Sequence, residues 1–172
     1  MPPIRRLTVL QEPASPDDGR PAWHWMLIGT LFALSIWVPL AMLSSWIAGR
    51  AVRRLVGEGP PDVVADQLAT ASGMTRVGLW FAVTGVPILS FAGACVAAGA
   101  LVGRFGNRAG VKEAAMGAAL AAAVGALLSM LQAGWAFSLA GLLVLLPVGA
   151  SAGWLGGRIG WGRRPLAERR PR

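Results

Sequence analysis

The sequence predicts an all-α, polytopic integral membrane protein, a bundle of four transmembrane helices. Three observations predict this fold class. Four long apolar runs contain no Asp, Glu, Lys or Arg. Only 14% of the 172 residues are charged, whereas a soluble domain usually carries about a quarter. The basic residues flank the apolar runs, as expected for side chains at the edges of a bilayer.

The four runs cover residues 23–47, 77–102, 114–131 and 136–155. The length of each run is close to that of a helix that crosses a bilayer, about 20 residues. Helices are predicted because backbone groups in lipid must bond within their own segment. Strands of membrane barrels show apolar and polar residues in alternation over about ten residues. The four runs lack this pattern. Pro39, Pro87 and Pro147 lie inside three of the runs, where each is predicted to kink its helix.

The segments between the runs differ in character. Residues 1–22 are predicted to be a polar cytoplasmic tail, residues 48–76 an external loop, and residues 156–172 an Arg-rich cytoplasmic tail. The start of the external loop is expected to continue the first helix. Residues 62–71 are expected to form a short amphipathic helix.

The connection between the second and third runs contains the sequence GNRAGVKE. A phosphate-binding loop needs a longer spacing, a hydroxyl residue after the lysine and a preceding strand. A helical hairpin is therefore favoured. Gly103 is expected to end the second helix, while Gly106 and Gly110 supply turn conformations. Glu113 is expected to favour the start of the third helix through its dipole.

Orientation follows from the basic residues. Twelve of the 16 fall in the two tails and the second loop, and four fall in the first loop. The positive-inside rule therefore places both termini on the cytoplasmic side of the membrane. The membrane is expected to be the inner membrane of a bacterial cell. Arg50, Arg53 and Arg54 lie on the opposite side. A glycine followed by arginine recurs at 49–50, 103–104 and 157–158, and each pair is expected to mark a helix end.

Two sets of residues are candidate functional sites. Small residues spaced by four, as in GxxxG motifs, are predicted to let helices approach closely, within one chain or between chains: Gly99, Gly103, Gly117, Ala121, Gly125, Gly149, Gly153 and Gly157. Basic residues beside the runs are predicted to contact anionic lipid headgroups: Arg104, Arg108, Lys112, Arg158, Arg163 and Arg164.

The residues that carry most enzyme chemistry are few. His24 and Cys95 are the only histidine and cysteine, fewer than a zinc site requires. Asp62 and Asp66 fit a solvated helix face better than a cation site. No cofactor, metal or nucleic acid is expected.

The first functional hypothesis is a small non-enzymatic inner-membrane protein that serves as an accessory, scaffold or stabilising subunit. The alternative is a small oligomeric transporter or channel-like protein. The expected partners are the lipid bilayer with its anionic headgroups, and either another membrane protein or a second copy of the chain.

Overall fold

The computed structural model describes residues 21–57, 61–106, 110–133 and 135–163, and this part of the chain is helical without a strand. The helices are α1 (Ala22–Val56), α2 (Pro61–Thr70), α3 (Gly73–Trp80), α4 (Val86–Phe105), α5 (Val111–Ala133) and α6 (Trp135–Gly162), with a π-helical turn, η1 (Phe81–Gly85), between α3 and α4. Four segments are long and apolar enough to cross a membrane: Trp23–Arg54, Gly73–Phe105, Val111–Met130 and Ser138–Gly162. The prediction of four long apolar helices is confirmed.

The helices extend beyond the apolar runs. Helix α1 continues past the first run to Val56, as the sequence predicted, and α2 occupies the place expected for the short amphipathic helix. Helix α6 continues to Gly162, so residues 156–162 are helical rather than the start of a tail. An apolar run marks the part of a helix that suits lipid, and a helix ends only where its backbone turns. For α1 this happens at Gly57, where φ is 93° and the N–H donates to the Arg53 carbonyl at 3.1 Å.

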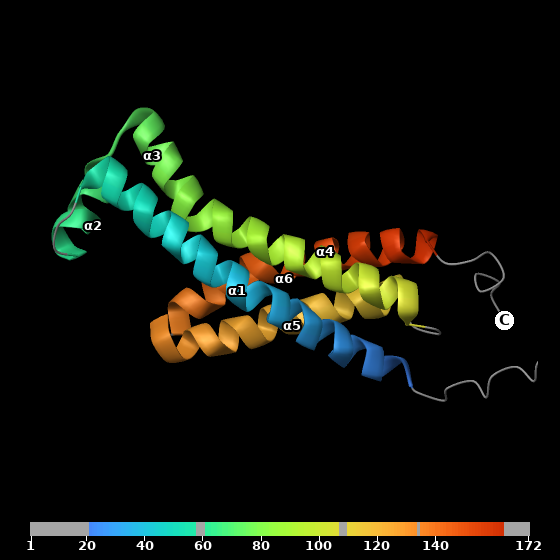
Figure 1. Ribbon diagram of the computed structural model, residues 1–172. Helices are drawn as coiled ribbons and strands as arrows, with labels where there is room; N and C mark the ends of the chain where they lie inside the picture. Colours follow the sequence, from blue (N-terminus) through green and yellow to red (C-terminus); the bar gives the residue numbers. More distant parts are fainter. Residues whose placement is uncertain (1–20, 58–60, 107–109, 134, 164–172) are drawn as a thin grey trace, which may run out of the picture.

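The start of α1, the end of α4 and the end of α6 lie on the same side of the bundle, which we call the terminal end (Figure 1). Helix α1 packs on α4 and α5. Helix α6 contacts both α4 and α5 extensively, whereas α4 and α5 contact each other much less. At the opposite end α3 and η1 pack mainly on α1, away from the α5–α6 turn (Figure 1).

The core is built from small side chains around one aromatic pair. Phe91 is buried, and the Trp37 ring meets its edge with centroids 5.5 Å apart. The other buried members of this cluster are Ala33, Cys95, Ala98, Ala118, Ala121, Ala122 and Ala152. Large apolar side chains point outward instead, for example Met42 and Leu143, which are 72% and 78% exposed. This distribution suits a bundle whose surroundings are as apolar as its interior.

The three prolines have different consequences. Pro39 and Pro147 lie inside α1 and α6, which continue through them. Pro87 lies in the first turn of α4, directly after η1. A proline lacks an N–H and its ring clashes with the carbonyl four residues earlier. The wider π turn removes that clash, and the chain passes Pro87 without leaving the helix.

Candidate functional site

Glycines line the contact between α4 and α6. A Cβ atom added at Gly99 would overlap the Gly153 carbonyl oxygen, and one added at Gly103 would overlap the Gly157 carbonyl oxygen. The two backbones therefore touch along a stripe that advances by four residues on each helix. A side chain at Gly99 or Gly103 would therefore force α4 and α6 apart.

A second pair of glycines extends the same contact. Cβ atoms at Gly156 and Gly160 would overlap the carbonyl oxygens of Val96 and Ala100. The predicted stripe, Gly149, Gly153 and Gly157, follows one ridge of α6 and leaves out this pair on the adjacent ridge. Their spacing by four within GGRIG was the available signal. Helix α6 thus presents glycines to α4 along two adjacent ridges.

The stripe on α6 also faces α5. A Cβ at Gly153 would lie 2.6 Å from the Ala118 Cβ, and one at Gly157 would lie 2.9 Å from the Ala114 Cβ. A Cβ at Gly149 would lie 3.0 Å from the Ala118 carbonyl oxygen. The three predicted glycines of α6 therefore lie where α4, α5 and α6 meet.

The remaining predicted packing residues belong to the contact of α5 with α1. A Cβ at Gly117 would lie 2.8 Å from the Met26 carbonyl oxygen, and one at Gly125 would lie 3.4 Å from the Trp37 ring. Ala121 is fully buried between them on the same helix. The seven glycines of the predicted set thus lie in two regions of helix contact, and Ala121 belongs to the buried core.

Hydroxyl groups join the helices at three places. Thr30 Oγ1 lies 2.9 Å from both the Met26 and Gly117 carbonyl oxygens, so its single proton is shared between α1 and α5. The Ser44 and Ser90 hydroxyls are 2.8 Å apart between α1 and α4, and those of Ser129 and Ser138 are 3.0 Å apart between α5 and α6. Such bonds stabilise membrane helix contacts by about 0.6–2 kcal/mol each.

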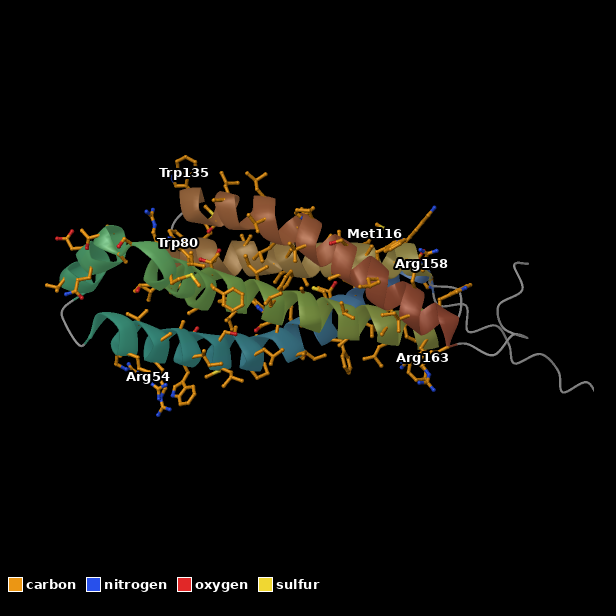
Figure 2. All side chains as sticks on the ribbon, turned by 90° about the horizontal axis from the view of Figure 1, so that it is seen from above. Arg54, Trp80, Met116, Trp135, Arg158 and Arg163 are labelled. Carbon is orange, nitrogen blue, oxygen red and sulfur yellow. The ribbon has the colours of Figure 1, made fainter. Side chains whose placement is uncertain are left out.

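Basic side chains gather at the terminal end. Arg104, Lys112, Arg158 and Arg163 are all exposed there. Figure 2 shows Arg158 and Arg163 at this end and Arg54 at the other. The Arg104 guanidinium lies 5.3 Å from the centre of the Phe105 ring, and that of Arg158 lies 4.7 Å from the Trp154 ring. Predicted lipid contacts at Arg108 and Arg164 lie outside the described residues.

The expectation that each glycine–arginine pair marks a helix end is wrong. Helix α1 continues for six residues beyond Arg50, and α6 continues beyond Arg158 to Gly162. Arg50 lies 4.3 Å from the Trp46 ring centre, so WIAGR and WLGGR share an arginine placed over a tryptophan one turn earlier. The repeated pattern therefore places a cation over an aromatic ring.

Glu113 lies in the first turn of α5, where the sequence predicted a dipole interaction, and it also forms a capping hydrogen bond. The Gly110 N–H donates to Glu113 Oε2 at 2.6 Å, which satisfies a backbone donor that the helix leaves free. The predicted need for glycine conformations in this turn is wrong at Gly106, where φ is −75°. In the described ranges positive φ occurs only at Gly57 and Gly73. Helix α4 also continues two residues past Gly103 to Phe105.

An apolar groove between α1 and α4 was not predicted. It encloses about 170 Å³ at the terminal end of the bundle and opens to the surroundings. Its walls are Trp25, Ile28, Gly29, Phe32, Ala98, Leu101, Val102 and Phe105. At the wall of the groove α1 packs closely on α4, because a Cβ added at Gly29 would lie 2.9 Å from the Val102 side chain. The two residues are far apart in the sequence, so only the packing of α1 on α4 reveals the groove.

The residues considered for chemistry lie apart. His24 stacks on Trp23 with ring centroids 3.8 Å apart, and Cys95 is buried in the core. Among residues 21–57, 61–106, 110–133 and 135–163, no three metal-ligating side chains come together. The chain matches no protein-family model, and comparisons with curated proteins and with solved structures find no match.

Proposed function

We propose that this chain is a non-enzymatic, multi-pass protein of a bacterial inner membrane that serves as an accessory, scaffold or stabilising subunit. The observation that carries this proposal is the backbone contact among α4, α5 and α6. Glycine and alanine fill this junction. The junction is therefore a close-packed helix contact rather than the wall of a channel. The large apolar side chains point outward from the same helices, where they offer a surface to lipid or to the helices of a partner.

The basic terminal end supports a cytoplasmic position for both termini. Arg104, Lys112, Arg158 and Arg163 are exposed at this end of the bundle. Cations beside a span favour the cytoplasmic side, and anionic headgroups attract each by about 1 kcal/mol near the surface. In this orientation the terminal end of the bundle would lie against the cytoplasmic leaflet.

A small oligomeric transporter is the second candidate, and one observation favours it. The second span contains the η1 turn beside Pro87, and the part before it packs mainly on α1. Single π turns are often found at functional sites. A movement of α3 and η1 relative to the α5–α6 hairpin would give such a transporter its two states.

Purification of the full chain from its native membrane in a mild detergent tests the two candidates. The accessory role predicts a complex of fixed stoichiometry with another membrane protein, retained through two chromatographic steps. A homo-oligomer that gives solute flux in liposomes would contradict that role. In that case Pro87→Ala, compared with Pro147→Ala, tests the transporter: loss of flux with intact assembly is expected only at Pro87.

A further inference from the structure

The groove between α1 and α4 has the shape and chemistry of a hydrocarbon site. All eight residues of its walls are apolar. Trp25 and Phe105 lie toward the helix ends and Phe32 and Ala98 lie deeper. At the rise of an α-helix, seven residues on each wall give the groove a length of about 10 Å. Apolar cavities of about 150 Å³ are known to bind small hydrocarbons, so the volume of about 170 Å³ suits a section of an acyl chain.

A positively charged side chain lies at the outer end of the groove. Arg104 follows the groove residue Val102 by two positions, is exposed, and holds its guanidinium over the Phe105 ring that forms part of the wall. Within the described part of the chain no carboxylate pairs with Arg104. A ligand with an apolar tail in the groove would therefore place its polar end beside an available positive charge.

We infer that the groove binds one acyl chain of an anionic phospholipid, with the lipid phosphate at Arg104. The inference rests on the proposed membrane insertion and is independent of the accessory role. The groove opens to the lipid on the side of the bundle, so the ligand enters without leaving the bilayer. Its charge complements Arg104, and its tail has no polar group to leave unpaired against the apolar wall.

Two matched pairs of variants separate this site from general attraction to the membrane. Ile28 and Ile159 are both 40% exposed, but only Ile28 lines the groove. Ile28→Trp should fill the groove, whereas Ile159→Trp should leave it open. Arg104 and Arg158 each lie over an aromatic ring at the terminal end, so Arg104→Gln is compared with Arg158→Gln.

The full chain is reconstituted in nanodiscs of phosphatidylglycerol and phosphatidylcholine in equal amounts, then extracted and weighed by native mass spectrometry. One retained phosphatidylglycerol per chain is expected. Arg104→Gln should reduce the preference for this lipid about fivefold, the effect of one headgroup cation, and Ile28→Trp should abolish retention. Ile159→Trp should behave as wild type, and Arg158→Gln, which removes only a general headgroup contact, should reduce the preference less than Arg104→Gln. Equal losses in Arg104→Gln and Arg158→Gln would overturn the inference, because they indicate only diffuse charge attraction.

A photoreactive group in the acyl chain of phosphatidylglycerol provides a test that needs no variant. Cross-links to Trp25, Ile28, Phe32 and Leu101 should exceed those to Ile159. Cross-links spread evenly over the helices, or a second copy of the chain covering the groove, would overturn the inference. Failure of the chain to enter nanodiscs would instead contradict the membrane insertion on which the proposed function depends.

Discussion

Replacing Gly153 with leucine should strongly destabilise the bundle. Already for alanine, the new Cβ would lie 2.6 Å from the Ala118 Cβ, whereas ordinary contacts begin at 3.4 Å. Helix α6 would have to move from α5 by about 0.8 Å, the difference between these two distances. Such a movement presses α6 onto α4, because Gly99 already touches the Gly153 carbonyl on that side.

The magnitude follows from this confinement. Overpacking a close-packed interior costs about 1–3 kcal/mol, and helix propensity returns up to about 1 kcal/mol when glycine is replaced by alanine. Gly153→Ala should therefore lower the free energy of unfolding by about 0–2 kcal/mol. Gly153→Leu places three more carbon atoms in the same space, and a loss of about 3 kcal/mol or more is expected.

Gly141 supplies the matched control. It lies on the same helix, and a Cβ there would meet nothing within 4 Å. Gly141→Leu should leave the free energy of unfolding unchanged or raise it slightly. Leu143→Ala, at a position 78% exposed, should also have an effect below about 0.5 kcal/mol.

The measurement is reversible unfolding of the full chain in mixed micelles, titrated with a denaturing detergent and followed by circular dichroism and tryptophan fluorescence. If Gly153→Leu and Gly141→Leu unfold at the same detergent fraction, then Gly153 does not hold the helices in contact. A lower midpoint for Gly153→Leu alone supports the close contact.

Three other predictions concern separate parts of the chain. Thr30→Val should lower the free energy of unfolding by about 0.6–2 kcal/mol in the same titration, because it removes the hydroxyl that links α1 to α5; an unchanged midpoint would show that the bond contributes nothing. Glu113→Ala should cost about 1 kcal/mol by removing the acceptor for Gly110 N–H, and Glu113→Gln, which keeps an acceptor oxygen, should cost less. Reporter fusions at residue 60 should be active outside the cytoplasm and those at residue 107 inside it, and the opposite pattern would refute the proposed orientation.

The four helices could be predicted because lipid imposes a simple requirement on sequence. A span needs a long apolar run free of charge, and each run is visible without knowledge of its neighbours. A favourable role of Glu113 at the start of α5 could be predicted for a similar reason, since the Gly110 N–H that it accepts from lies within one helical turn. Local physics and local sequence are sufficient for such features.

Features that depend on two distant segments could not be predicted. The hydroxyl of Thr30 reaches a carbonyl 87 residues away, and nothing in the sequence near either residue specifies that pairing. The groove likewise requires residues 25–32 of α1 to pack beside residues 98–105 of α4. Gly156 and Gly160 were missed for a different reason: they lie on a second ridge of α6, beside the predicted stripe.

The position of α6 between α4 and α5 has a consequence for biogenesis. Helix α6 follows both neighbours in the chain, so it leaves the ribosome after them. Until then Gly99, Gly103 and Ala114 lack the backbone that covers them in the finished bundle, and α4 and α5 have few contacts with each other. Before α6 is added, the earlier long helices are joined mainly through α1, which contacts both α4 and α5. On the proposed membrane insertion, a delay in adding α6 would extend the time during which the small-residue faces of α4 and α5 stay uncovered.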